Sequence, residues 1–215
     1  MADEEQNEAQ APTFLRCAAE VARLVGINGG TVAKDQRARR LALAVRRPLL
    51  ERATLPEELL APLMAAAVYD PDPSFCRWFV EPALYAFGRR RVRDALVEYL
   101  RTGTDAERAG AMRAWYCAHL PLRADRSPAY APHGTRDPGL DESQTAVDAW
   151  LEALLHLYAQ TADPQMHHRI VLNLPTSPEA YPPHLHELLE GTVAAAGTHP
   201  SRHIRAWAVE VGQTQ

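Results

Sequence analysis

The sequence predicts an all-α fold, a short right-handed α-solenoid of about ten helices packed as antiparallel pairs. Three observations predict it: apolar residues recur at helical spacing, alternating strand patterns are nearly missing, and one turn pattern returns about every thirty residues. Val92, Ala95, Leu96, Tyr99 and Leu100, for example, follow the spacing that places side chains on one face of a helix. Such stripes are buried when helix packs on helix.

The expected helices follow from these stripes and from helix start signals. Asp163 before Pro164 is typical of a start, because the carboxylate caps the first turn and the missing proline N–H costs nothing there. Asp72 before Pro73 has the same form. Thr104 has capping-box spacing to the glutamate three residues later. In chain order the expected ranges are 12–25, 33–47, 56–69, 73–87, 89–101, 105–119, 142–161, 164–173, 179–196 and 200–211.

Glycines at the ends of these ranges indicate helix stops, because glycine adopts the backbone conformations that terminate a helix. They are Gly88, Gly103 and Gly197. The ninth range also contains Pro183, which leaves open a start only after that proline.

A turn pattern recurs four times: a leucine-rich helix, a tight turn of Asp, Thr or Pro, and an arginine entering the next helix. The arginines are Arg77, Arg108, Arg169 and Arg205. Intervals in the thirties of residues, one of them doubled, are typical of stacked helix pairs, since one pair cannot bury both its faces alone. An irregular helical bundle with recurrent Asp-Pro caps is the alternative.

This pattern resembles the HEAT-repeat family, an armadillo-like α-solenoid whose usual unit is an apolar helix, an Asp-Pro turn and then Val-Arg-x-x-Ala. The run 204–208, Ile-Arg-Ala-Trp-Ala, fits best, and 105–111 comes next. The resemblance covers 56–120 and 146–211, and it departs at 166–169, where Met-His-His-Arg replaces the usual start.

The resemblance implies a curved domain whose concave side is built from the second helix of each pair. It also implies that the repeat arginines are structural, bridging adjacent turns. A non-enzymatic scaffold or adaptor that binds a protein or peptide on the concave side is the expected function, by analogy of fold.

Composition divides the chain into an acidic N-terminus, 1–11, expected to be disordered, and a single helical domain, 12–213. Within the domain, 12–47 is expected to act as an N-terminal cap and 121–141 as a long loop. Four of the 27 acidic residues lie in the first ten positions, so the remainder balances the 23 basic residues. A neutral body is a poor electrostatic footprint for general nucleic-acid binding.

A cytoplasmic location is expected from three features. No apolar run approaches the roughly 20 residues that span a bilayer, no secretory signal is recognisable at the start, and the three cysteines are odd in number and far apart. Cys17, Cys76 and Cys117 lie among apolar neighbours, which indicates buried reduced thiols.

The loop 121–141 is the expected partner-binding region, because long ordered loops are often binding loops. Together with the nearby helix it supplies the candidate contact residues Arg113, Trp115, Arg123, Arg126, Tyr130, His133 and Arg136, which would meet an acidic partner. A flexible insertion without function is the alternative reading of this loop.

Two arginine clusters favour a second function, nucleic-acid binding. They comprise Arg37, Arg39, Arg40, Arg46 and Arg47 in one helix and Arg89, Arg90, Arg91 and Arg93 in another. Some chains of this type resemble HEAT-like alkylpurine DNA glycosylases, which hold DNA in a basic groove with tryptophans and a carboxylate. The four tryptophans invite the comparison, but no carboxylate stands beside one in a recognisable motif. The alternative interpretation is that both clusters are solvated helix faces.

No catalytic set, cofactor site or metal site is expected. Glu152 with His156, and His199 with His203, have a permissible ligand spacing. HEAT-like hydroxylases that bind two irons repeat a His-Glu dipeptide, and this chain has one, His186-Glu187. The glycines at 26–30 lack the flanking strand and Lys-Ser/Thr of a phosphate loop.

Overall fold

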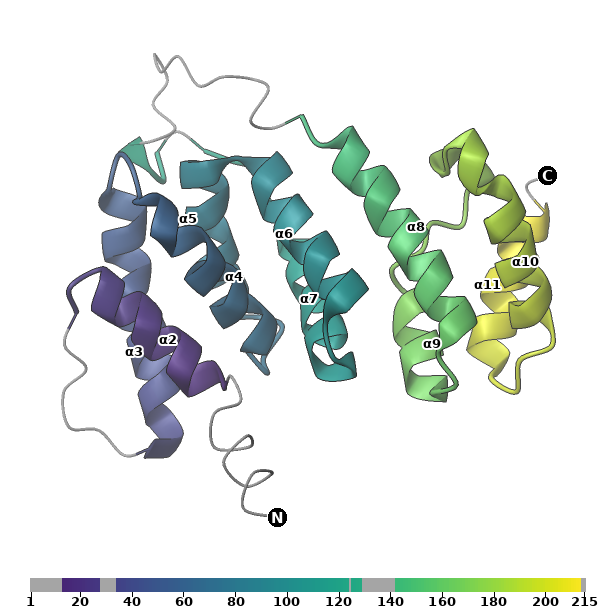
Figure 1. The fold of residues 1–215 in the computed structure, drawn as a ribbon, viewed down its shortest axis with the longest axis horizontal. Helices are drawn as coiled ribbons and strands as arrows, with labels where there is room; N and C mark the ends of the chain where they lie inside the picture. Colours follow the sequence, from purple (N-terminus) through teal and green to yellow (C-terminus); the bar gives the residue numbers. More distant parts are fainter. Residues whose placement is uncertain (1–12, 28–33, 124, 129–141, 214–215) are drawn as a thin grey trace. The chain divides into compact units, whose positions relative to one another are not determined.

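A computed structural model describes residues 13–27, 34–123, 125–128 and 142–213. These residues form ten α-helices and three short 3-10 helices, and no strand occurs among them (Figure 1). The expectation of an all-α protein is therefore confirmed. In the first half the elements are α2 (Phe14–Leu24), α3 (Lys34–Glu51), η1 (Glu57–Leu59), α4 (Leu60–Tyr69), α5 (Arg77–Phe87) and α6 (Arg89–Thr102). In the second half they are α7 (Asp105–Cys117), α8 (Gln144–Gln160), α9 (Pro164–Val171), η4 (Pro178–Ala180), η5 (Pro183–Leu185), α10 (His186–Gly197) and α11 (Arg202–Gln213).

The chain divides into two compact units. Unit 1 comprises residues 1–95 and 113–142, and unit 2 comprises 96–112 and 143–215. The boundary passes through α6 and α7, so each of these helices contributes residues to both units.

In unit 1 two helix pairs pack against each other, first helix against first helix and second helix against second helix. α2 packs against α3 within the first pair, and α4 packs against α5 within the second. Between the pairs, α2 contacts α4 and α3 contacts α5. Phe79 of α5 lies in the core without exposed surface, and its ring meets that of Phe14 edge to face at 6.1 Å between centroids.

Unit 2 repeats the same neighbour relations with α8 to α11. α8 packs against α9, α10 packs against α11, and the two pairs meet through α8 with α10 and α9 with α11 (Figure 1). Trp150, Leu154 and Leu155 of α8 are almost completely buried in this unit. Together with the packing of unit 1, this shows that consecutive helices form pairs in both units.

Two of the predicted capping signals, those of Thr104 and Asp163, are present. The Glu107 carboxylate accepts from the Thr104 backbone N–H at 2.7 Å, and the Thr104 hydroxyl oxygen accepts from the Glu107 N–H at 3.4 Å, as in a capping box. At α9 the Asp163 carboxylate accepts from the Gln165 N–H at 2.9 Å. These side chains satisfy N–H groups that have no partner within the helix.

The start of the helix expected at 73–87 was predicted wrongly. α5 begins at Arg77 and not at Pro73, because side-chain hydrogen bonds hold the preceding residues in turns. The Asp70 carboxylate accepts from the Asp72 N–H at 3.0 Å, and the Asp72 carboxylate accepts from the Ser74 N–H at 2.9 Å. Such local bonds offer the backbone an alternative to helix.

The start of α4 and the end of α3 also differ from the prediction, because α4 begins at Leu60, after the 3-10 turn at 57–59, and not at residue 56. α3 continues through Pro48 to Glu51, beyond the expected end at 47, and Leu49 in this added turn is 1% exposed. Burial of Leu49 offsets the hydrogen bond that a proline removes from a helix. α10 begins at His186, after two 3-10 turns, so the later of the two predicted starts is confirmed.

Gly88 alone separates α5 from α6, and it ends α5 as predicted. Its backbone has φ 85° and ψ 158°, a region that only glycine enters without strain. The expected helix stops at Gly103 and Gly197 also fall within one residue of observed helix ends.

Asp70, at the end of α4, connects three segments of unit 1. Its side chain has no exposed surface and accepts two hydrogen bonds from the Arg39 guanidinium, at 2.7 and 2.8 Å. The same guanidinium lies over the Phe75 ring, 4.3 Å from its centroid. Arg113 of α7 donates to the Asp70 and Val68 carbonyls at 3.2 and 3.4 Å. Helices α3 and α7 thus both contact the turn that follows α4.

The three cysteines are buried and form no disulfide, as the sequence predicted. The sulfurs of Cys76 and Cys117 lie 3.4 Å apart and share a hydrogen bond. The contact with Cys117 and burial both raise the pKa of the Cys76 thiol, so it stays protonated at neutral pH. None of the described helices combines the length and the apolar character that crossing a bilayer requires.

Candidate partner-binding site

Arg113 and Trp115, two of the predicted contact residues, take part in the packing of unit 1. The Arg113 guanidinium is occupied by the backbone carbonyls at the end of α4. Trp115 is 7% exposed, with the Arg93 guanidinium 5.1 Å from its ring centroid. Burial lowers the pKa of Arg93 to about 10, so Arg93 remains a cation at neutral pH. This placement gives no support to a contact between these two residues and a partner.

His119, which follows α7, makes the stability of unit 1 sensitive to pH. Its ring meets Trp115 edge to face, and burial followed by the nearby Arg93 charge lowers its pKa from 6.5. The unfolded chain therefore binds the proton more readily than the folded chain, so stability is lost as the pH falls below 6.5. We expect the free energy of unfolding to decrease between pH 7 and about pH 5, and to decrease less in His119→Gln.

Urea unfolding at several pH values measures this difference. The carboxylates whose pKa values are lowered, Glu20, Glu57, Asp125 and Glu179, lose their contribution only below about pH 4.5 and do not interfere. The same pH dependence in both chains would contradict the assignment to His119.

Arg123 and Arg126 lie in the segment that follows α7. Hydrogen bonds anchor this segment to two helices of unit 1. The buried Tyr85 hydroxyl of α5 donates to the Arg123 carbonyl at 3.2 Å and accepts from the Arg123 N–H at 2.9 Å. Arg89 of α6 donates to the carbonyls of Ala118 and Leu120. The start of the predicted binding loop is therefore held in place by hydrogen bonds that sequence reasoning did not identify.

This anchoring brings four arginines around one small pocket, here called the arginine pocket. Its volume is about 170 Å³, and it is lined by Arg46 of α3, Arg77, Glu81 and Tyr85 of α5, and Leu120, Pro121, Arg123 and Arg126 of the following segment. Two predicted contact residues thus meet Arg46 and Arg77, which were not predicted to lie beside them.

The charges of the arginine pocket are only partly balanced. Arg46 lies 3.5 Å from the Glu81 carboxylate, and Arg123 forms an ion pair with Asp125 at 2.9 Å. Arg77 and Arg126 are exposed and have no ion-pair partner within the described part of the chain. The pocket therefore carries an excess of positive charge suited to a carboxylate or phosphate group.

A second hollow adjoins the arginine pocket and shares Arg46 and Arg126 with it. This leucine hollow has a volume of about 390 Å³ and is lined by Leu43, Arg46, Arg47, Leu50, Glu51, Asp125 and Arg126. Leu43 is 59% exposed, whereas Leu41 and Leu49 of the same helix are buried. A ligand that spans both hollows would place an acidic group beside an apolar one.

Three other predicted contact residues, Tyr130, His133 and Arg136, lie outside the described residues. The acidic N-terminus at 1–11 and most of the loop at 121–141 lie there as well. Their roles remain predictions.

The two arginine clusters do not form a continuous free basic stripe. Arg39 is paired with Asp70, Arg46 with Glu81 and Arg47 with Glu51, while Arg91 contacts Glu57. Arg89 is bound to backbone carbonyls. These contacts use donors that phosphates would otherwise engage, so the structure does not add support for nucleic-acid binding.

The repeat arginines differ in their contacts. Arg205 donates to the carbonyls of His199 and Pro200 in its preceding turn, at 2.6 and 2.7 Å, as the resemblance implied. Arg108 pairs with Asp105 at 3.0 Å. Arg77 and Arg169 make no comparable side-chain contact among the described residues, so the structure adds no support for a structural role at these two positions.

The described residues contain no group of three or more His, Cys, Asp or Glu side chains arranged to hold a metal ion. Comparison of the chain with protein-family models, with curated proteins and with solved structures finds no match. The arguments for function therefore come from the site itself.

Proposed function

We propose that this chain is a non-enzymatic, cytoplasmic adaptor of HEAT-like solenoid architecture that binds an acidic, partly apolar segment of a protein partner. The repeated packing of helix pairs within each unit supports the architecture. The absence of a disulfide among the buried cysteines is consistent with a reducing compartment.

The observation that carries the proposal is the pair of unbalanced arginines, Arg77 and Arg126, in a pocket next to exposed leucine surface. Guanidinium groups bind carboxylates through paired, charge-assisted hydrogen bonds. Leu43 and Leu50 offer an apolar surface immediately beside them. A peptide with acidic and apolar residues in alternation matches both hollows.

The test uses a fluorescently labelled peptide of aspartate, glutamate and leucine, with binding measured by anisotropy at low and moderate salt. The double variant Arg77→Glu/Arg126→Glu is expected to bind the peptide about a hundredfold more weakly, roughly tenfold for each reversed contact. Binding of the unmodified chain should weaken with salt, as contacts between charges do.

The matched control is Arg37→Glu/Arg90→Glu, which makes the same change in net charge at two exposed arginines outside both hollows. It is expected to bind the peptide with nearly unchanged affinity. Equal losses in the two double variants, or equal binding of a peptide with Asn and Gln in place of the acids, would reject the arginine pocket as the site. Tight, salt-sensitive binding of a short DNA duplex would favour the nucleic-acid alternative instead.

A further inference from the structure

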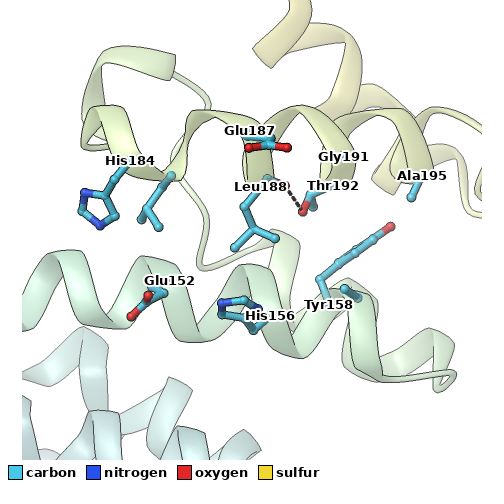
Figure 2. A pocket seen from close by; sticks show the side chains of 11 residues that line it. Glu152, His156, Tyr158, His184, Glu187, Leu188, Gly191, Thr192 and Ala195 are labelled. Carbon is cyan, nitrogen blue, oxygen red and sulfur yellow. Dashed lines mark hydrogen bonds between the residues drawn. The ribbon is translucent and has the colours of Figure 1, made fainter.

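A larger groove lies in unit 2, between α8 and α10, and none of the residues that the sequence singled out for partner binding lines it. Its volume is about 600 Å³, within the range of ligand-binding clefts. Figure 2 shows side chains of α8, among them Glu152, His156 and Tyr158, facing those of α10 and the turn before it.

The groove follows two helical stripes along their length. On α10 the lining positions 187, 188, 191, 192 and 195 form one face of the helix, and on α8 the positions 152, 156 and 159 do the same. The lining of the α10 side from His184 to Ala195 covers roughly 16 Å at the rise of a helix. A space of three turns between two helix faces fits a third helix better than a compact molecule.

The inner surface of the groove is mainly apolar. Leu185 is buried, Leu188 is half-buried, and Gly191 presents no side chain. The Thr192 hydroxyl donates to the Leu188 carbonyl at 2.9 Å within α10, so its hydrogen bond is satisfied inside the helix (Figure 2). Apolar residues of a bound helix would find matching surface here.

Tyr158 brings a polar group to this groove that has no partner in the described structure. The residue is 4% exposed, and its hydroxyl makes no hydrogen bond within the described residues. Figure 2 shows its ring extending from α8 toward Ala195. Burial raises the pKa of Tyr158, so the hydroxyl is a neutral donor at physiological pH. A buried hydroxyl without a partner is rare in folded proteins.

The negative charge of the groove favours a cationic ligand. No lysine or arginine lines it, and its two acids differ in their contacts. Glu152 pairs with Arg101 at 3.0 Å, whereas Glu187 is exposed and has no ion-pair partner among the residues described. Glu190, exposed on the next turn of α10, adds to the negative potential.

We propose that the α8–α10 groove binds an amphipathic helix of a protein partner that presents apolar residues together with a lysine or arginine. The apolar stripe packs between α8 and α10, and the cation lies beside Glu187. This site has the opposite charge preference from the arginine pocket and stands independently of it. The two sites would let one chain hold two different partners.

The probe is a labelled synthetic helix with leucines at i, i+3, i+4 and i+7 and flanking lysines, and the comparison is the same leucine pattern with flanking glutamates. Anisotropy is expected to show binding of the lysine peptide at least tenfold tighter than that of the glutamate peptide. Equal or reversed affinities would overturn the proposal.

Gly191 offers a substitution that blocks the groove without disturbing the core. A Cβ placed there meets no atom within 4 Å, and replacing a helical glycine raises helix propensity. Gly191→Leu is expected to weaken binding of the lysine peptide at least tenfold. Gly197→Leu is the matched control, because its Cβ is equally unobstructed and it lies at the end of the same helix outside the groove.

A charge variant provides a second, independent measurement. Glu187→Lys is expected to weaken binding of the lysine peptide about tenfold, and Glu190→Lys less than threefold. Equal effects of the two changes would overturn the role of Glu187, and an unaltered affinity in Gly191→Leu would place the peptide elsewhere. Self-association of the unmodified chain that Gly191→Leu abolishes would assign the groove to a second copy and would also overturn the proposal.

Discussion

Replacing Asp70 with alanine is expected to lower the free energy of unfolding by about 3 kcal/mol. The change removes a carboxylate that is completely buried and leaves the Arg39 guanidinium without its two hydrogen bonds. It also removes the acceptor for the Asp72 N–H, which shapes the turn before α5. Arg39 is itself 31% exposed, so water recovers part of its solvation and keeps the loss at the lower end for a broken buried pair.

Urea denaturation followed by circular dichroism measures this loss. Glu51→Ala is the control, because it breaks the exposed Arg47–Glu51 pair and is expected to cost at most about 0.5 kcal/mol. Asp70→Asn keeps the shape and separates the effect of charge from that of packing. Equal stabilities of Asp70→Ala and Glu51→Ala would show that the Asp70 contacts do not hold unit 1 together.

Replacing Trp150 with alanine is expected to lower the free energy of unfolding by about 4 kcal/mol. Trp150 is 1% exposed and is the largest of the almost completely buried side chains, so the change removes a large apolar surface and leaves a cavity in unit 2. Denaturation in urea gives the loss, and amide hydrogen exchange shows which helices lose protection.

Tyr116→Ala serves as the comparison, since Tyr116 is 81% exposed. It is expected to change the stability by less than about 0.5 kcal/mol. A small loss in Trp150→Ala, close to that of Tyr116→Ala, would contradict the placement of Trp150 in a core.

The helices could be predicted from the sequence because their signals are local. The capping box of Thr104 and Glu107 and the Asp163 cap depend on residues three or fewer positions apart, and both were identified. The start of α5 was missed because Asp70 and Asp72 bind backbone N–H groups in turns, a competition that helix propensity does not describe.

The candidate sites depend on contacts between distant segments, so the sequence predicted them only in part. Arg123 and Arg126 were identified from the length of their loop, whereas Arg46 and Arg77 join them only through the fold of unit 1. Arg39 was assigned to a solvated helix face, yet it pairs with a carboxylate 31 residues away. Pairing of this kind decides which arginines have a structural role and which are free to bind a partner. The residue type alone does not reveal this difference.

The single-residue connection at Gly88 has a consequence for how the chain tolerates changes in length. Because α6 starts immediately after Gly88, one inserted residue would rotate the following helix by about 100° about its axis. Val92 and Leu96, which are now fully buried, would then turn out of the core and polar neighbours would turn in. The rotation of α6 about its own axis thus depends on the connection having only one residue. An insertion there would be far more damaging than most substitutions.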